Sequence, residues 1–482
     1  MRRRVWPVSH ARILLAGCAA FIAFCFFLKA VQFRFLVVGG FDSAQYDQAL
    51  WTTLRGHFLK TSLHGRPLSI IALHTTFFHA LLAPVYALLP GPQTLSNLQA
   101  VLFAAAAFPL FWSARRRLGA DAALLFALAY LLNPVVARCM INGYYGTRIF
   151  PVPFLIASLW ALDEGRDGLF LAFAAMAASC DEATAVVVAG IGVLAARFLG
   201  RPRLGACTAV AGIGYFFLAV TWIQVRFGNI NPMGPLELRS DGPTRLGWTI
   251  SFIASHPGLL LARLFEARKA FYLLKLFLPT LFAPLFAASW LLPAVPVFFL
   301  TLMLTGRWLL DDFAPAWTAL SIPFLFFGAA AGVERLSRRP WARRLGRDPA
   351  AVLCAGMIAA SLGTQVLGEW TTITYIVTQR ADGEDLRTLL RAIPPEASIA
   401  ASDSALPFLV KRWRAYALLA PGLDQNPDYV LLEEGSIPCQ MTGPDRAAAY
   451  AALERAVTEG GRYKSVVRAG RFSLWRARSL PF

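Results

Sequence analysis

Apolar stretches of about 20 residues recur along most of this chain, and each is long enough to cross the roughly 30 Å hydrocarbon core of a bilayer as a helix. Hydrophobic residues make up 57% of the 482 residues, and only 15% are charged. A soluble chain averages about 25% charged residues. The first stretch, 13–38, is too long for the apolar core of a signal peptide, and no A-x-A cleavage site follows it. We therefore expect a multi-span membrane protein that retains its first span.

The net charge of +18 would fit a nucleic-acid-binding protein, but the distribution of the charges argues against one. The arginines gather in short patches between apolar stretches, namely 2–4, 115–117, 197–203 and 335–347. Basic loops of this kind stay on the cytoplasmic side of a membrane. We interpret the patches as markers of topology, and we expect membrane lipid, and no nucleic acid, as a partner.

A cytoplasmic N-terminus allows a threading in which every arginine-dense connection lies on one side of the membrane. This threading predicts about 11 spans. Their ranges are 12–38, 96–114, 120–138, 150–162, 168–180, 183–198, 204–224, two spans within 272–306 that meet at a tight inner turn near 290–293, 315–332 and 349–370. Two long segments, 39–95 and 225–268, then lie on the outer side.

The last part of the chain, 371–482, changes in character. The segment 382–393 predicts a helix with Asp382 as its N-cap, and 443–461 predicts a second helix that Pro444 opens and Gly460 closes. Short β-type segments accompany these two helices, at 398–402, 429–433, 465–469 and 472–477. We therefore expect a transmembrane domain over 1–370 and a small extracytoplasmic α/β domain over 371–482.

The threading brings many ionisable side chains to the outer surface of the membrane. They are Asp42, Asp47, His57, His64, His74, His79, Arg148, Asp181, Glu182, Asp311 and Asp312. Ionisable groups beside the hydrocarbon are costly, so they tend to face a cavity or a partner. Asp181 and Glu182 make the sharpest case, because they interrupt an apolar run from 169 to 194. The alternative is that these two acids only mark a short turn between spans.

The segment FDSAQYDQALWTTL, 41–54, predicts a short amphipathic helix that lies along the membrane surface. Asp42 at its start has two interpretations, a helix N-cap and a general base at a membrane-facing cavity. Four histidines follow in 57–79, at spacings of 7, 10 and 5 that match no standard metal-ligand pattern. We expect them to contact a phosphate or a hydroxyl-rich ligand one by one, and we expect no metal site.

Four blocks of the sequence resemble, in order, the landmarks of domain-of-unknown-function family 2079. They are FDSAQYDQALW, the run from LHTTFFHALLAPVYALLPG to ARRRLG, CDEATAVVVAGIGV, and IPPEASIAASDSALPFLVKR with DYVLLEEG. The resemblance covers nearly the whole chain. That family resembles the GT-C superfamily of glycosyltransferases, which take a sugar from a polyprenyl-phosphate carrier on the outer side of the membrane. The chain departs from the family at Cys180, where the resemblance would place a lysine.

The resemblance implies an all-α, GT-C-like transmembrane fold in a bacterial inner (plasma) membrane, with amphipathic surface helices in the first outer segment. It also implies an enzyme that transfers a hexose or pentose from a polyprenyl-phosphate-linked sugar to an extracytoplasmic acceptor. Asp42 matches the superfamily's essential acid by position, and Asp47 is the second candidate for a catalytic acid. The candidates for substrate binding are His74, His79, Tyr145, Arg148, Asp181, Glu182, Asp311 and Asp312.

We expect no cofactor, and the sequence leaves open the sugar, the acceptor, the oligomeric state and the use of a divalent cation. The alternative function is a non-catalytic or transport component of envelope lipid or polysaccharide assembly. A transporter more often carries polar residues in the middle of its spans. Here the polar groups gather at one face, which favours chemistry at the surface.

The predicted topology can be tested with a reporter fused after Phe482. An odd number of spans from a cytoplasmic start places the C-terminus outside, so alkaline phosphatase fused there should be active and green fluorescent protein should be dark. The reverse pattern would put the acids and histidines of the outer segments on different sides of the membrane.

Overall fold

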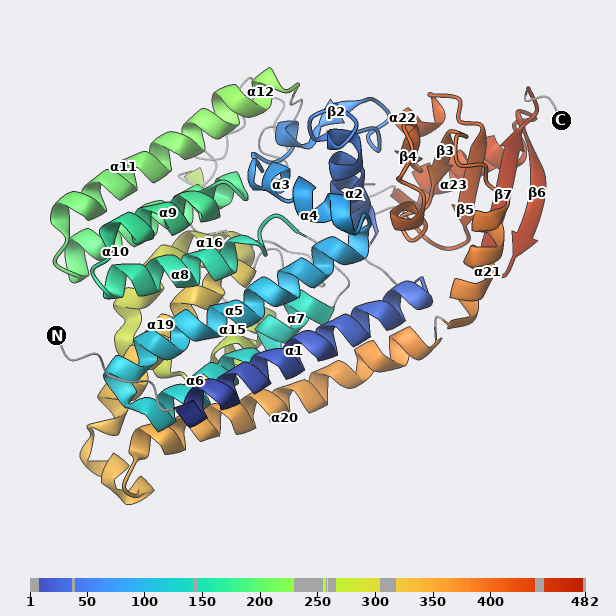
Figure 1. The fold of residues 1–482 in the computed structure, drawn as a ribbon. Helices are drawn as coiled ribbons and strands as arrows, with labels where there is room; N and C mark the ends of the chain where they lie inside the picture. The colour runs from blue at the N-terminus through green and yellow to red at the C-terminus, as the bar shows by residue number, and fades with distance from the viewer. Residues whose placement is uncertain are drawn as a thin grey trace.

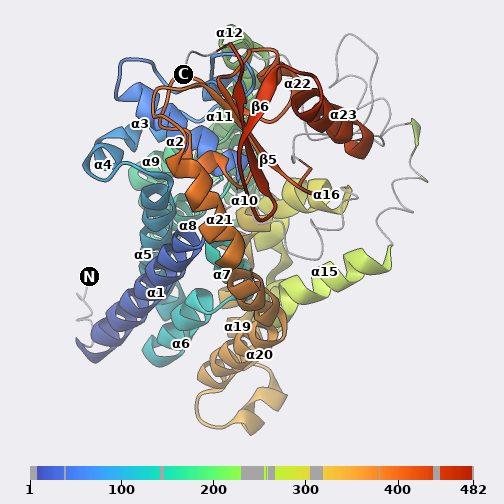
Figure 2. The ribbon, with the colours of Figure 1, turned by 90° about the vertical axis from the view of Figure 1, so that its right-hand side faces the viewer.

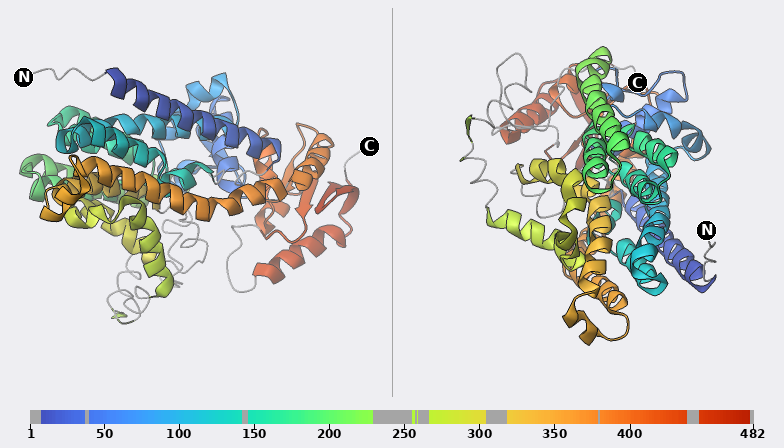
Figure 3. Two further views of the ribbon diagram at one scale, coloured as in Figure 1. Left: turned by 90° about the horizontal axis from the view of Figure 1, so that it is seen from below. Right: turned by 90° about the vertical axis from the view of Figure 1, so that its left-hand side faces the viewer.

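The computed structural model describes residues 8–36, 40–141, 146–228, 255–256, 258, 266–303, 318–378, 380–437 and 446–479. Within this part of the chain, most helices run side by side in a bundle, and a five-stranded sheet lies beyond one end of that bundle (Figure 1). The first helix begins at the opposite end from the sheet, as the two views of Figure 3 also show.

Apolar composition explains the helices of the bundle. They are α1 (Val8–Arg34), α5 (Pro92–Leu118), α6 (Ala120–Leu131), α7 (Pro134–Ile141), α8 (Pro151–Asp163), α9 (Asp167–Ala178), α10 (Glu182–Phe198), α11 (Pro202–Leu218), η2 (Ala219–Ile223), α12 (Gln224–Arg226), α15 (Ala267–Phe277), η3 (Leu278–Thr280), η4 (Ala283–Ala294), α16 (Val295–Met303), η5 (Ala319–Ser321), α19 (Ile322–Ser337), η6 (Pro340–Leu345) and α20 (Pro349–Thr378). Their facing sides form one hydrophobic core, which includes Phe103, Phe126, Leu155 and Phe326.

Four helices among the described residues are long and apolar enough to cross a membrane, namely Ser9–Arg34, Pro92–Leu118, Pro202–Arg226 and Ala319–Ser337. The number rises to as many as 6 if two bent pairs each count as one span. Shorter apolar helices, Pro151–Asp163, Asp167–Ala178 and Pro349–Gln365, coincide with three more predicted spans. The helical membrane class is therefore as expected, and the full set of about 11 spans stays a prediction.

One predicted turn was wrong. We expected the chain to reverse near 290–293, but η4 continues through that segment. The bend lies earlier, between Ala267–Thr280 and Ala283–Phe299, whose axes differ by 110°. It is formed by Leu281 and Phe282, whose φ angles of 50° and 54° lie in the left-handed region. Neither residue ordinarily adopts this conformation, but Pro279 and Pro284 flank the two residues and are a local signal of a helix break.

Helices α10 and α11 pack backbone to backbone through glycines. A Cβ atom added to Gly205 would lie 2.4 Å from both the nitrogen of Ala196 and the carbonyl oxygen of Gly192. Small residues allow this approach, which is a common way for membrane helices to associate. The contact fixes α10, and α10 carries Asp181 and Glu182 at its outer end.

The predicted first outer segment folds into α2 (Phe41–Thr53), strands β1 (Lys60–Thr61) and β2 (Leu68–Ser69), η1 (Ile70–Ala72), α3 (Phe78–Leu81) and α4 (Ala83–Leu88). Helix α2 forms where an amphipathic surface helix was expected, but that expectation was wrong about its surroundings. Ten of its 13 residues are buried, including Gln45, Asp47 and Gln48. Other parts of the protein therefore cover α2 on most sides, and it is no simple surface helix.

The last part of the chain contains α21 (Arg380–Arg391), η7 (Leu406–Phe408), α22 (Ala420–Leu423), α23 (Arg446–Thr458) and strands β3 (Ile399–Ala401), β4 (Ala415–Ala417), β5 (Tyr429–Glu433), β6 (Tyr463–Ala469) and β7 (Phe472–Ala477). The strand order is β4-β3-β5-β7-β6. β3 is parallel to β4 and β5, whereas β7 is antiparallel to β5 and β6. α20 continues past residue 370 to Thr378, and α21 leads on to the sheet (Figure 2).

The close packing of α10 and α11 can be tested by adding bulk at Gly205. Gly205→Val should lower the free energy of unfolding by about 1–3 kcal/mol, because two backbones would have to separate. Gly214→Ala on the same helix is the matched control, since nothing lies within 4 Å of its added Cβ. The measurement is the thermal midpoint of each purified variant in detergent, and equal midpoints for the two variants would contradict the described packing.

Candidate active site

Asp181 caps the N-terminus of α10. Its backbone is extended, with φ −163° and ψ 140°, and its Oδ1 accepts a hydrogen bond of 2.9 Å from the backbone nitrogen of Ala183. An aspartate in this position satisfies a backbone donor that the helix cannot. The positive end of the helix dipole also stabilises the carboxylates of Asp181 and Glu182. Asp181 precedes α10 and Glu182 is its first residue, so the start of this helix stabilises both carboxylates.

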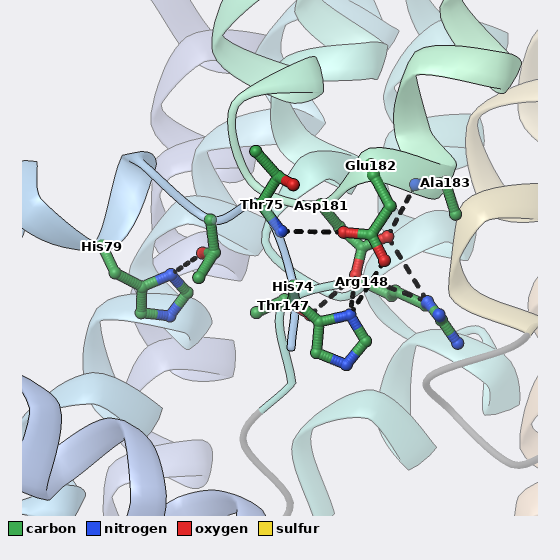
Figure 4. Close-up of polar contacts among 9 residues, drawn as sticks. His74, Thr75, His79, Thr147, Arg148, Asp181, Glu182 and Ala183 are labelled. Carbon is green, nitrogen blue, oxygen red and sulfur yellow. Dashed lines mark hydrogen bonds and ion pairs between the residues drawn. The ribbon is translucent and has the colours of Figure 1, made fainter. Parts of the chain in front are cut away.

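Two other segments of the chain meet these two carboxylates (Figure 4). Just before α8, the hydroxyl of Thr147 donates to Asp181 Oδ2 at 2.9 Å, and Arg148 Nε lies 3.4 Å from the same oxygen. From the first outer segment, the backbone nitrogen of Thr75 donates to Glu182 Oε2 at 2.8 Å. His74 Nδ1 lies 3.1 Å from Glu182 Oε1 and 3.4 Å from Asp181 Oδ2. We call His74, Arg148, Asp181 and Glu182 the polar cluster.

Exposure differs among the side chains of the polar cluster. The exposed fraction is 0% for the Asp181 side chain and 11% for Glu182, against 30% for His74. Figure 4 shows one edge of the His74 ring turned toward the carboxylates and the other edge turned away from them. The cluster thus contains two acids, but the group that it exposes most is an imidazole.

Burial alone would lower the pKa of His74, but the Glu182 and Asp181 carboxylates outweigh it and hold the pKa above its usual value. Arg148 opposes this rise. In the same way, burial would raise the pKa of Glu182, and His74 and Arg148 hold it below its usual range. The two carboxylates therefore favour the protonated form of the His74 ring, in which Nδ1 faces Glu182 and Nε2 carries a second hydrogen-bond donor.

Asp42 and the two acids of the polar cluster all act electrostatically on one side chain, Tyr46. Tyr46 is one helical turn after Asp42, is 2% exposed, and shares a hydrogen bond with Thr147. Burial raises the pKa of Tyr46 well above its usual value, and the charges of Asp42, Asp181 and Glu182 raise it further. Three carboxylates from two separate segments therefore act on one phenol. Asp42 is half-buried in the first turn of α2.

Asp47 and His79 occupy the interior instead. Asp47 is 0% exposed, and the Tyr86 hydroxyl donates to its Oδ1 at 2.6 Å. Burial raises the pKa of Asp47 to about 7, with Tyr86 and Lys411 opposing the rise. His79 is 0% exposed, stacks on Tyr46 at 4.8 Å between ring centroids, and hydrogen-bonds Thr76. Burial, together with the charge of His74, lowers the pKa of His79 to about 3, so the ring is neutral.

Of the other predicted site residues, Tyr145, Asp311 and Asp312 lie outside the described residues. The polar cluster has three neighbours that the sequence did not single out for the site, namely Tyr46, Thr75 and Thr147. These three carry no charge at neutral pH, and Thr75 takes part through its backbone nitrogen. Thr147 directly precedes Arg148, so a search of the neighbours of each predicted charge would have found it.

Ligand atoms of His74, Asp181 and Glu182 lie within 4.8 Å of one another, a spacing that would suit a metal ion. The surroundings fit a metal poorly, however. All four carboxylate oxygens already face a donor from the protein, and the guanidinium of Arg148 lies against Asp181. A divalent cation would have to displace some of these donors against the charge of Arg148. The expectation of no metal therefore stays our prediction.

Comparison with solved structures identifies the fold. Crystal structures of ArnT from Cupriavidus metallidurans match with TM-scores of 0.54, bound to undecaprenyl phosphate, and 0.55, in the apo state. The sequence identity is 15% and 14%, over 96% and 95% of this chain and 98% and 97% of ArnT. The oligosaccharyltransferase AglB from Archaeoglobus fulgidus, in complex with an inhibitory peptide and a dolichol-phosphate, scores 0.46 at 13% identity, over 96% of this chain and 75% of AglB. ArnT and AglB are GT-C glycosyltransferases, and the ArnT matches show that this chain shares the overall fold of ArnT.

The family can also be stated plainly. A profile of the family described as "Predicted membrane protein (DUF2079)" matches residues 33–470, and the chain belongs to that family. The resemblance noted in the sequence is thereby confirmed. No curated protein matches the chain.

The ion pairs of His74 predict a pH-dependent contribution to stability. Because folding raises the pKa of His74, this contribution is fully present below the unfolded pKa of about 6.5 and is lost as pH rises through the folded value. Wild type should therefore exceed His74→Gln in unfolding free energy by about 1–3 kcal/mol at pH 6, and by less at pH 9. Glu182→Gln should reduce the same pH dependence. A difference that grows with pH would contradict the assignment.

Proposed function

We propose that this protein is a glycosyltransferase that moves a sugar from a polyprenyl-phosphate donor to a hydroxyl of an extracytoplasmic acceptor. The observation that carries the proposal is that Asp42 and the acids of the polar cluster act on one buried phenol, that of Tyr46, while the cluster exposes His74 more than its acids. The fold supports the proposal, because one of the ArnT structures that share it is bound to undecaprenyl phosphate.

The polar cluster suits the phosphate of such a donor. A phosphate diester is an anion, and it needs hydrogen-bond donors and positive charge at short range. The Nε2–H of His74 and the guanidinium of Arg148 supply both, while Asp181 and Glu182 hold these two groups in place. The isoprenoid tail would lie against the apolar helices, which requires no further polar group.

Asp42 supplies the base. It takes the proton of the acceptor hydroxyl while the hydroxyl oxygen attacks the anomeric carbon, and the bond from that carbon to the phosphate oxygen breaks. The lipid phosphate leaves with the electron pair, and the anomeric configuration inverts. The His74 imidazolium and Arg148 stabilise the charge that develops on the leaving phosphate. The energy of the donor's own phosphate ester drives the step, so no nucleotide is needed.

Asp47 is not assigned this role, although it is an acid on the same helix. It lies about 140° further round α2 than Asp42, and it is completely buried against Tyr86. His79 is likewise completely buried, so neither residue enters the proposal as a group that touches substrate. A transport or non-catalytic role is the rival, and it would leave Asp42 without a chemical task.

The proposal is tested with Asp42→Asn and Asp47→Asn, purified at matched protein levels and thermal midpoints. Loss of a positioned base should lower turnover by about 10²–10⁴-fold in Asp42→Asn. Asp47→Asn can keep the hydrogen bond from Tyr86, so it should lower turnover by less than about tenfold. The assay follows labelled sugar leaving a panel of undecaprenyl-phosphate hexoses and pentoses, with the lipid of the purified wild type identified by mass spectrometry.

Two results would count against the proposal. If Asp47→Asn is the more damaging variant, the base is misassigned. If undecaprenyl phosphate co-purifies with the protein but no donor in the panel is turned over in the presence of native membrane extract as acceptor, a transport or non-catalytic role is favoured instead.

A further inference from the structure

The side chain of Gln48 joins three segments of the chain in the interior. Gln48 lies near the middle of α2 and is 0% exposed. Its Oε1 accepts hydrogen bonds from the Thr61 hydroxyl at 2.8 Å and from the Ser62 nitrogen at 2.9 Å. Its Nε2 donates to Ser62 Oγ at 3.1 Å and to the carbonyl oxygen of Arg412 at 2.9 Å. Both polar atoms of the Gln48 amide are thus hydrogen-bonded, and the bond to Arg412 connects α2 to the C-terminal part of the chain.

The partners of Gln48 continue this connection into the five-stranded sheet. Ser62 Oγ donates to the carbonyl oxygen of Ala415 at 2.7 Å and accepts from the Ala415 nitrogen at 3.1 Å. The nitrogen of Ala417 donates to the carbonyl oxygen of Leu63 at 2.9 Å. Because β4 is the outermost strand of the sheet on this side, Ser62 and Leu63 cover its edge.

The C-terminal part also packs tightly just ahead of Asp42. A Cβ atom added to Gly40 would lie 2.6 Å from the carbonyl oxygen of Asp403, in the loop that follows β3. A Cβ on Gly65 would lie 2.5 Å from the carbonyl oxygen of Pro421. The first outer segment is thus held against the C-terminal part both before and after the helix that carries Asp42.

We propose that Gln48 is a positioning residue, and that the C-terminal sheet is part of the machinery of the site because, through Gln48, it sets the place of Asp42. This inference rests on the proposed function, in which Asp42 is the base. A displacement of about 1 Å at a catalytic group can cost on the order of 100-fold in rate. Gln48 lies six residues after Asp42 on one rigid helix, so a shift or tilt of α2 at Gln48 reaches Asp42 directly.

Gln48→Glu isolates the connection to the sheet. The carboxylate has the size of the amide and can still accept from the Thr61 hydroxyl and the Ser62 nitrogen, but it cannot donate to Ser62 Oγ or to the carbonyl oxygen of Arg412. We expect hydrogen exchange in peptides covering 412–418 to accelerate by about tenfold, because the Ala415 and Ala417 amides are held by Ser62 and Leu63. We expect turnover to fall by at least about tenfold, with undecaprenyl phosphate binding unchanged within about twofold.

Two further variants accompany Gln48→Glu. Gln48→Met removes the hydrogen bonds without adding charge and should act in the same direction. The matched control is Gln45→Met, because Gln45 is a buried glutamine of the same helix whose hydrogen bond goes to His64, within the first outer segment. It should leave exchange at 412–418 unchanged.

A double variant separates positioning from a general loss of stability. If Gln48 acts through Asp42, Gln48→Glu should cost nothing further in residual turnover once Asp42→Asn is present. The same fold-loss in both backgrounds would overturn the inference, as would faster exchange at 412–418 with wild-type turnover. Full turnover in Asp42→Asn alone would instead refute the proposed base, and that outcome is read from the single variant.

Discussion

The carboxylate of Asp181 is completely buried, and the residues at that end of the helix bundle are arranged to compensate its charge. A buried carboxylate is tolerated only when nearby donors and cations compensate it. Here the compensation comes from the start of α10, from Thr147 and Arg148 ahead of α8, and from His74 in the first outer segment. Removing any one of these partners leaves the charge short of a donor, so the three segments are held in one relative geometry. The imidazole that faces outward is a result of this arrangement.

The two acids of α2 illustrate how surroundings assign different tasks to the same side chain. Asp47 is sealed against Tyr86, and its raised pKa reflects the loss of water around it. Asp42 is half-buried, one turn from a tyrosine that also lies in the field of Asp181 and Glu182. Environments that separate two carboxylates in this way are common where one of them acts on a proton. The proposed chemistry assigns that act to Asp42, whereas Asp47 contributes to the packing of α2 on α4.

Much of the architecture could be predicted because the bilayer imposes a simple rule on composition. The spans that contain α1, α5, α11 and α19 follow from apolar length alone. The strand segments 429–433 and 472–477 follow from their β-type residues. The bend at Leu281 was missed because it lies inside a continuous apolar run, although the helix-breaking Pro279 and Pro284 flank it. The surroundings of α2 were missed because the groups that cover its glutamines, such as the carbonyl oxygen of Arg412, are more than 300 residues away. In the site, the interrupted apolar run indicated Asp181 and Glu182, but uncharged Tyr46 and Thr147 left no comparable signal.

The strand edge covered by Ser62 and Leu63 bears on the order in which the molecule can be built. An uncovered edge strand offers its backbone groups to any other chain, and this makes it a site of aggregation. The residues that protect β4 precede it by 353 positions, as the bond between Ser62 and Ala415 shows. During synthesis Ser62 and Leu63 are made first, and they have no β4 strand to contact until all the intervening helices have been made. The edge of β4 can therefore be covered only after all of the intervening chain has been made, and a chain in which Ser62 and Leu63 are displaced would leave this strand open to aggregation.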